Sequence, residues 1–305
     1  MATAIKQKIV PCIWLDNQAE EAAEFYTNLF NGGKIGRVLR YSEAGQEIHG
    51  QKPGSAMTAE LEIEGFQFML LNGGPIFKPN PSISFIVRCA EKDEINRLWE
   101  KLSDGGEALM PLQKYPFSEL YGWVSDKYGV SWQLMLDTDR TEQKISPSLL
   151  FVGKVCGKAE EAINFYVSVF KKFKVGDIAR YPAGMEPDKE GSVMYSDFIL
   201  EGQSFSAMDS AREHKFGFSE GISLIVNCGT QEEIDYYWEK LTAVRESEQC
   251  GWLKDKYGVS WQITPPVLDD MIENHQSENA KRAMNAMLKM KKLDIAELKR
   301  AYEGK

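Results

Sequence analysis

The sequence predicts an α+β protein made of two tandem copies of one domain, followed by C-terminal helices. Each copy has the pattern of two βαβββ modules, which we expect to form one cupped sheet. The main observation is an internal repeat. The repeated segments are AEEAAEFYTNLF (19–30) and AEEAINFYVSVF (159–170), then 83–102 and 222–241 with 11 identities in 20 positions, then DKYGVSWQ at 126–133 and again at 255–262. Their spacing of ~130–140 residues is that of a domain and excludes solenoids, whose units are ~20–50 residues long.

The first half of copy one reads as a strand, a helix and three strands. The predicted strands are IVPCIWL (9–15), IGRVLRY (35–41), AMTAELEIEG (56–65) and FQFMLLN (66–72). Between the first two, apolar residues from Ala22 to Phe30 recur at helical spacing, and NGG at 31–33 ends that helix. The glycine of EIEGFQ stands where two alternating strands meet and predicts a hairpin.

The same order then starts again in the second half of copy one. The strand SISFIVRC begins at Ser82, and a helix follows in which Ile95, Leu98 and Leu102 share one face. A glycine-rich break at 104–106 precedes weaker strands, and the final pair, YGWVS and VSWQLML, turns at DKYG.

Copy two repeats this order from Ser148 to Thr264, and Thr230 with Glu233 is placed as a capping box before its second helix. The difference in residue number between equivalent positions of the two copies is 139 at Leu102 and 129 at Trp123. Copy two has therefore lost about ten residues between these two positions.

After Pro265 and Pro266 the pattern is helical only, with Asp294 and Glu297 as a capping box in the last helix. We therefore expect a first domain at 1–138, a second at 145–264 and a helical tail at 265–305.

The charge balance argues against two classes of partner. Lys and Arg number 36 and Asp and Glu number 45, which gives a net charge of −9 over 305 residues. A general nucleic-acid binder or a protein of anionic membrane surfaces would want the opposite sign. The start, MATAIKQKIV, lacks the apolar run of a signal peptide, and no stretch reaches the ~18 apolar residues of a membrane span, so we expect a cytoplasmic protein.

Cysteine and histidine give no familiar metal or catalytic motif. The five cysteines show neither CxxC nor CxxH spacing, and we interpret them as buried thiols. His49, His214 and His275 lie singly in predicted loops or the tail. The sequence also lacks a G-x-S-x-G elbow, a Walker A loop and H-E-x-x-H.

These motifs resemble a known superfamily. The paired modules, the helix AEEAAEFYTNLF ending in FNGG, the strand MTAELEIEG and the hairpin D-x-Y-G-V-S-W-Q resemble the vicinal oxygen chelate superfamily, which includes glyoxalase I, bleomycin-resistance proteins and ring-cleaving dioxygenases. They are most similar to its PhnB-like branch, which carries the label 3-demethylubiquinone-9 3-methyltransferase. The resemblance implies two tandem glyoxalase-like domains, and single-domain relatives that pair as dimers.

Metal-dependent members of the superfamily take four ligands from four strands, and the resemblance places those positions here. The first position falls at Pro11 in copy one and at Phe151 in copy two. The second falls near Leu70 or Leu71, and near Ser206 or Ala207; the third falls near Ser82 or Ile83, and near Gly221 or Ile222. The fourth is Gln133 in copy one and Gln262 in copy two. One glutamine per domain cannot hold Zn²⁺, Ni²⁺ or Fe²⁺ against water, so we expect no metal and no other cofactor.

The candidate ligand-binding residues come from the strands of each copy. Gln133 and Gln262 are buried amides if they face inward, and either a ligand or structural water could satisfy them. Glu60 and Asp197 occupy equivalent places, and many PhnB-like members have a histidine two residues earlier, where Thr58 and Tyr195 stand here. Alternatively, both acids face solvent, each on a strand whose side chains alternate between core and solvent, and have no part in binding.

Copy one keeps a longer segment before Trp123, in which Tyr115, Phe117 and Tyr121 are available as an aromatic lid. We therefore expect copy one to hold the ligand and copy two to act as its structural partner.

The function expected from these residues is metal-independent binding of a small, partly aromatic molecule. The alternative is an enzyme, an isomerase, lyase or transferase, acting through Glu60 or Asp197. Methyl transfer has almost no residue support, because a methyl-donor site would need a doubly wound sheet and a glycine-rich loop. We further expect the two domains to pair with each other, with a possible homodimer through the C-terminal helices.

Overall fold

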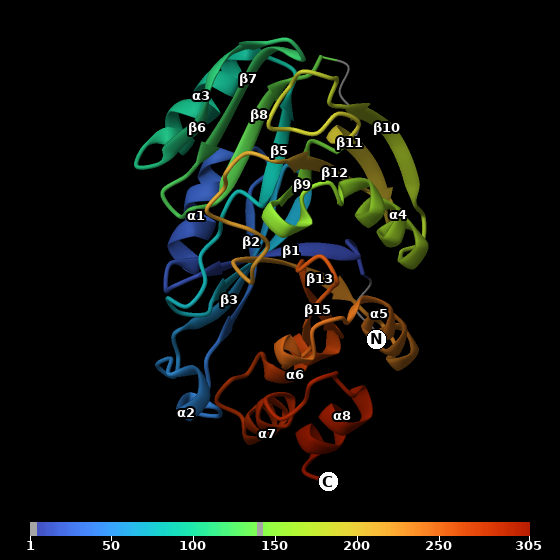
Figure 1. Cartoon of the computed structure of the whole chain (residues 1–305). Coiled ribbons are helices and arrows are strands. Elements are labelled where there is room, and N and C mark those ends of the chain that lie inside the picture. The colour runs from blue at the N-terminus through green and yellow to red at the C-terminus, as the bar shows by residue number, and fades with distance from the viewer. Residues whose placement is uncertain (1–4, 139–142) are drawn as a thin grey trace.

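The computed structural model describes residues 5–138 and 143–305, arranged as four successive modules and a helical tail (Figure 1). Module 1 contains β1 (Ile9–Leu15), α1 (Ala19–Leu29), β2 (Lys34–Arg40), the short α2 (Gln46–His49), β3 (Ala56–Ile63) and β4 (Phe66–Asn72). Module 2 contains β5 (Ile83–Cys89), α3 (Lys92–Ser103), β6 (Glu107–Tyr115), β7 (Ser118–Ser125) and β8 (Ser131–Leu136).

Copy two supplies the other two modules. Module 3 contains β9 (Ile145–Val152), the 3-10 turn η1 (Gly153–Val155), α4 (Ala159–Val169), β10 (Lys174–Arg180), β11 (Val193–Leu200) and β12 (Gln203–Ser210). Module 4 contains β13 (Ile222–Asn227), α5 (Gln231–Leu241), η2 (Arg245–Ser247), β14 (Trp252–Lys254) and β15 (Ser260–Thr264). The tail contains α6 (Val267–Ile272), α7 (Glu278–Met287) and α8 (Ile295–Glu303). Among the described residues, no helix combines the length and apolar composition that a membrane crossing requires.

Two sheets organise the molecule, and each one mixes the two copies. Sheet A has seven strands in the order β14-β15-β13-β1-β4-β3-β2, which joins module 1 to module 4. Sheet B has eight strands in the order β10-β11-β12-β9-β5-β8-β7-β6, which joins module 2 to module 3. The α+β class and the duplicated modules are as predicted, but the expectation that each copy closes its own cupped sheet is wrong.

The packing inside copy one is consistent with this pairing of modules from different copies. Phe68 of β4 meets Phe85 of β5 at 4.9 Å between ring centroids, so modules 1 and 2 face each other across the core instead of extending one sheet. The edges of β1 and β5 then lack partners within copy one. Strands of copy two pair with them in antiparallel fashion, β13 with β1 and β9 with β5. An unpaired strand edge would expose a row of backbone donors and acceptors, so this pairing stabilises both sheets.

The aspartate of the repeated motif DKYGVSWQ is buried and links two modules by hydrogen bonds. Asp126 Oδ2 accepts hydrogen bonds from the hydroxyl of Tyr26 at 2.7 Å and from Trp132 Nε1 at 2.8 Å. Its Oδ1 accepts the backbone N–H groups of Tyr128 and Val130. In copy two, Asp255 makes the same four bonds, to Tyr166, Trp261, Tyr257 and Val259. Because Tyr26 lies on α1, each aspartate ties the helix of one module to the terminal hairpin of the next.

The deletion predicted in copy two removes a whole strand. Module 4 has only the 3-10 turn η2 and coil where module 2 has β6, so its pattern is not the full βαβββ that the sequence suggested. The chain after α7 covers this place, because the backbone N–H groups of Cys250 and Gly251 donate to the carbonyl oxygens of Met290 and Lys291 at 2.8 and 2.7 Å.

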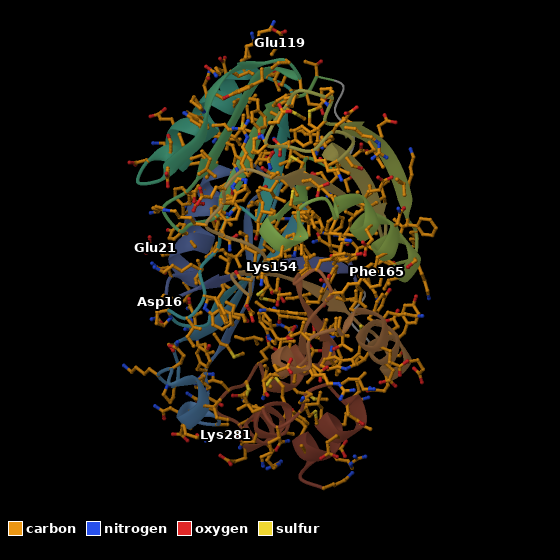
Figure 2. The ribbon with its side chains drawn as sticks, in the orientation of Figure 1. Asp16, Glu21, Glu119, Lys154, Phe165 and Lys281 are labelled. Carbon is orange, nitrogen blue, oxygen red and sulfur yellow. The ribbon has the colours of Figure 1, made fainter. Side chains whose placement is uncertain are left out.

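The C-terminal helices pack against the chain itself. A second hydrophobic cluster joins the tail to β2 and the loop after it, and it consists of Leu39, Ala44, Leu268, Met271, Ile272, Ala283, Met284, Leu293 and Leu298. Lys281 on α7, at the lower end of the molecule in Figure 2, donates to Glu43 Oε2 at 3.0 Å. The tail therefore lies over one side of sheet A, and a homodimer through these helices stays a prediction.

Candidate functional site

A cavity of about 550 Å³ lies between sheet A and the C-terminal helices. All seven strands of the sheet line it on the face turned away from the shared core, and we call this face and its cavity cup A. Residues of α6 and α7 close the other side, among them Leu268, Ile272 and Met287. Both copies and the tail are therefore needed to build it.

Strand alternation explains the apolar lining of cup A. On β1, Ile9 and Ile13 point into the core, whereas Val10 and Cys12 point into the cavity. The remaining apolar walls come mainly from Met57, Met69, Leu71, Ile225 and Met287. Methionine side chains are flexible and polarizable, so they adapt to ligands of irregular shape.

The centre of the sheet presents neutral polar groups to the cavity. Gln262 Nε2 donates to Ser223 Oγ at 2.9 Å, and Cys12 lies beside both. Burial raises the pKa of the Cys12 thiol to about 12, with a smaller opposing effect from its contacts with Gln262 and Ser223. Cys12 is therefore a protonated thiol at neutral pH, poorly suited to attack a substrate.

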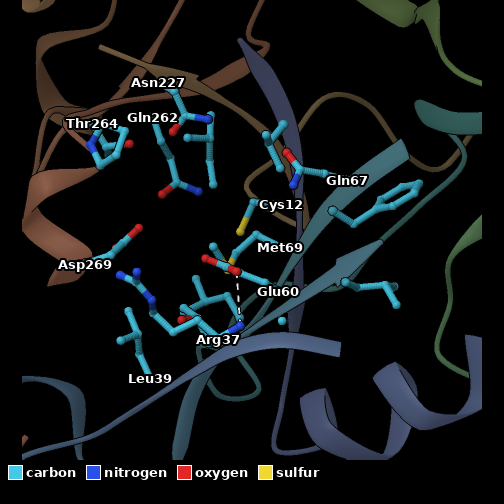
Figure 3. Close-up of a pocket in the computed structure, with 18 of the residues that line it drawn as sticks. Cys12, Arg37, Leu39, Glu60, Gln67, Met69, Asn227, Gln262, Thr264 and Asp269 are labelled. Carbon is cyan, nitrogen blue, oxygen red and sulfur yellow. Dashed lines mark hydrogen bonds between the residues drawn. The ribbon is translucent and has the colours of Figure 1, made fainter. Parts of the chain in front are cut away.

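Charged groups gather at one end of cup A, around Arg37 (Figure 3). Arg37 Nη2 lies 2.9 Å from Asp270 Oδ1, and Nε lies 3.7 Å from Glu273 Oε1. The Glu60 carboxylate accepts the backbone N–H of Arg37 at 3.0 Å. A Cβ at Gly36 would stand 2.6 Å from Glu60 Oε2, so only glycine permits this close approach to β2.

Asp269 on α6 faces the same space. Its half-buried carboxylate has neither a hydrogen bond nor an ion pair within residues 5–138 and 143–305. Burial raises the pKa of this carboxyl to about 7; Arg37 opposes the rise, whereas Glu60 and Asp270 add to it.

This pKa predicts how Asp269 affects stability. Between the unfolded pKa of about 3.9 and the folded value, the native state holds a proton that the unfolded chain has released, so the free energy of unfolding falls as pH rises. We expect Asp269→Asn to remove this fall and to be more stable than the wild type by about 1–3 kcal/mol at about pH 8, with little difference below about pH 4. Urea unfolding across this range measures it. The exposed Asp177→Asn is the control, and a variant whose pH profile matches the wild type would contradict the assignment.

On the equivalent face of sheet B, which we call cup B, polar side chains bond to one another. Gln133 Nε2 donates to Ser84 Oγ at 2.7 Å, and the Tyr121 hydroxyl donates to Gln133 Oε1 at 2.8 Å. Arg88 donates to the hydroxyls of Tyr195 and Ser146, at 3.0 and 2.8 Å. Within the described residues, two buried hydroxyls of this sheet, Ser148 Oγ and Ser206 Oγ, have no hydrogen-bond partner. Gln133, by contrast, has partners for both ends of its amide.

The structure distributes the predicted site residues over both cups. Thr58, Glu60 and Gln262 line cup A together, although they come from different copies. Gln133 belongs to sheet B, and Asp197 is an exposed residue of β11 beside Gly176 of β10. Because each cup draws on both copies, the expectation that copy one forms a complete cup of its own is wrong.

The predicted aromatic lid is a β-hairpin, β6–β7, whose pairing shifts register at several places, rather than a long loop. Tyr115 and Phe117 stack at its tip with 5.6 Å between ring centroids, and the Tyr115 hydroxyl donates to the carbonyl of Pro111. Tyr121 lies deeper and reaches Gln133. The hairpin extends sheet B and does not line the cavity of cup A.

Most residues that line cup A were not predicted, among them Cys12, Arg37 and Asp269. Cys12 could have been found from alternation along β1. Asp269 had no signal in the sequence, because an acid on a short helix ordinarily faces solvent.

Pro11, where the resemblance placed the first metal ligand, alternates with Cys12 and lies on the face of β1 away from cup A. The described residues that do face the cups from the central strands include no carboxylate and no imidazole. The central strands of cup A present Cys12, Met69, Ser223 and Gln262, and those of sheet B carry Ser84, Ser148, Ser206 and Gln133. Among the described residues, no three His, Cys, Asp or Glu side chains gather so that they could hold a metal ion. Serine hydroxyls and amides are weak ligands for Zn²⁺ or Fe²⁺, and Cys12, whose buried thiol is protonated, stands without a second strong ligand, so these residues do not fit such an ion.

The predicted equivalence of Pro11 with Phe151 is wrong. Cys12 pairs with Met69 as Ser148 pairs with Ser206, so the counterpart of Pro11 is Pro147 and not Phe151. The turn η1 lengthens the connection from β9 to α4, and the offset of the helices therefore does not apply to these strands.

A family model described as 3-demethylubiquinone-9 3-methyltransferase matches residues 7–135 and again residues 143–264. The chain belongs to this family. The two matches confirm the expected PhnB-like family and its tandem duplication, and the sheets agree with the predicted glyoxalase-like class. No match was found among curated proteins.

Solved structures include similar chains. A PhnB protein of the same description from Bacillus cereus shares 40% identity over 43% of this chain and 100% of its own, with a TM-score of 0.40. A protein from Staphylococcus aureus shares 34% identity over 43% of this chain and 96% of its own, with a TM-score of 0.18. Glyoxalase I from Zea mays shares 12% identity over 76% of this chain and 80% of its own, with a TM-score of 0.46.

Proposed function

We propose that this protein binds a small, partly aromatic molecule in cup A and does so without a resident metal. The observation that carries the proposal is a cavity of about 550 Å³ with apolar walls, into which Gln262, Glu60 and Asp269 point from three separate elements. Concave, mostly apolar cavities of ~300–1,000 Å³ with a few converging polar groups are typical of small-molecule sites.

A second candidate is an enzyme, an isomerase, lyase or transferase, acting in the same cavity. It is favoured by Asp269, because a carboxyl with a pKa of about 7 beside Glu60 suits proton transfer near neutral pH. Conversion of a bound compound, lost in Glu60→Gln, would decide for this candidate.

Methyl transfer, which the family's description names, is not part of the proposal. The doubly wound parallel sheet, a common fold for nucleotide-containing cofactors, is not formed by the described residues. Both sheets here contain antiparallel pairs at equivalent places, β3 with β4 and β7 with β8.

A matched pair of substitutions tests the binding site. Gln262 and Gln133 occupy equivalent positions, and each donates to an equivalent serine, so Gln262→Leu and Gln133→Leu make the same chemical change in the two sheets. We expect a compound found by a thermal-shift screen of metabolites and aromatic compounds to bind about tenfold or more weakly to Gln262→Leu, because a polar group of the ligand loses its partner.

The Gln133→Leu variant should bind that compound within twofold of the wild type, roughly the measurement error. Elemental analysis of the same preparation should find no stoichiometric transition metal. Equal losses in both variants, or a loss in Gln133→Leu alone, would place the ligand outside cup A.

A further inference from the structure

We propose that cup A selects an organic ammonium ion, a positively charged nitrogen on an apolar body, and that Glu60 and Asp269 hold its charge. This inference rests on the proposed function, because it names the chemical class of ligand for the same cavity.

The first argument is the balance of charge around Arg37. Its guanidinium group already has two anionic neighbours, Asp270 at 2.9 Å and Glu273 at 3.7 Å. Lys6, another cation at the cavity, pairs with Glu62 at 2.6 Å. Of the three cations that line the cavity, Arg37 and Lys6 are thus paired with carboxylates, and the third, Lys34, is an exposed residue at the start of β2. Glu60 and Asp269 are carboxylates without a paired cation in the described residues.

The second argument is the direction of these groups. Figure 3 shows the carboxylates of Glu60 and Asp269 entering the cavity from different elements, β3 and α6, with the amide of Gln262 pointing into the same space. Gln262 uses its amide nitrogen for Ser223, which leaves its carbonyl oxygen as an acceptor. Because β15 lies four strands from β3 in sheet A, Gln262 meets a different part of the ligand, and the carboxylates of Glu60 and Asp269 are the acceptors for the N–H donors of the ammonium group.

The third argument concerns the apolar body of the ligand. The methionine-lined walls of cup A lead to Trp252, which also lines a second cavity of about 310 Å³ with Trp14 and Phe77. Trp14 and Trp252 meet edge to face with 6.0 Å between ring centroids. An aromatic or alkyl group would extend from the carboxylates along the methionines toward these rings.

A carboxylate or phosphate is a poor alternative at this end of the cavity. It would meet Glu60 and Asp269 without a free guanidinium group to offset them, and like charges in a partly desolvated site repel strongly.

Three probes of equal length that differ in their head group test the charge. We would titrate the protein calorimetrically with 4-phenylbutylamine, 4-phenylbutan-1-ol and 4-phenylbutyrate at about pH 8, where Asp269 is ionised. We expect the amine to bind about tenfold or more tightly than the alcohol, and the acid to bind most weakly. Glu60→Gln and Asp269→Asn should each weaken amine binding about tenfold and leave binding of the alcohol unchanged.

Asp177→Asn, which removes an exposed carboxylate from sheet B, is the matched control and should bind the amine as the wild type does. Melting temperatures of all variants show that each is folded. An alcohol that binds as tightly as the amine, or an acid that binds most tightly, would overturn charge selection and leave cup A as the binding site.

Failure of all three probes would also overturn the ammonium inference. The proposed function would then be judged separately, by the response of a library compound to Gln262→Leu and Gln133→Leu.

Discussion

Residues 1–142 expressed alone should not yield a stable monomer. In the full chain, β1 pairs with β13 and β5 pairs with β9, so a separated copy would present two unpaired, largely apolar strand edges. Such edges associate with any available strand, and we expect dimers or aggregates from each half. Co-expression of 1–142 with 143–305 should instead give a soluble one-to-one complex, because both sheets are then complete.

Size-exclusion chromatography with light scattering measures this outcome. The full chain is the control for the mass and melting behaviour of the complex. Two halves that are each stable monomers, with no affinity for one another, would contradict the shared sheets.

Asp126→Ala should lower the free energy of unfolding by about 3–5 kcal/mol. The substitution removes four hydrogen bonds at once and leaves the buried Tyr26 hydroxyl and Trp132 N–H without an acceptor. Asp255→Ala should cost a similar amount, because its bonds in copy two are the same. Chemical denaturation followed by tryptophan fluorescence measures both.

The exposed Asp104 provides the control for this pair, since Asp104→Ala should change stability by no more than about 0.5 kcal/mol. A loss below about 1 kcal/mol in Asp126→Ala would show that the motif does not fasten the modules together.

The sequence predicted the elements well because their signals are local. The helix expected from Ala22 to Phe30 is α1, and the hairpins at EIEGFQ and DKYG are β3–β4 and β7–β8. The Thr230 side chain caps α5 as predicted, by accepting the backbone N–H of Glu233. Spacing and turn chemistry alone determine such features.

The pairing of strands was not predictable in the same way. IVPCIWL and ISFIVRC are both apolar strands, and their backbone edges can pair equally well with either copy. The pairing depends on tertiary packing, such as the contact of Phe68 with Phe85, which joins residues of neighbouring modules across the core. Periodicity along one segment carries no information on that contact.

The site could be predicted only in part, because it too depends on how the strands of the two copies pair. Glu60, Thr58 and Gln262 were identified from their places on strands, but their meeting in one cavity depends on the exchange of modules. Asp269 joins them only because the tail folds back over sheet A. The loss of the strand before β14 could be read from the repeat, whereas the tail segment that covers its place could not.

Methionine methyl groups offer the most direct test of the central claim that the ligand lies in cup A. Met57, Met69 and Met287 line that cavity, whereas Met110 and Met208 belong to sheet B. With methionine methyls labelled with ¹³C, titration of the tightest compound from the screen should shift the first three resonances and leave the other two in place. Shifts confined to Met110 and Met208 would show that the ligand binds in cup B and would contradict this account.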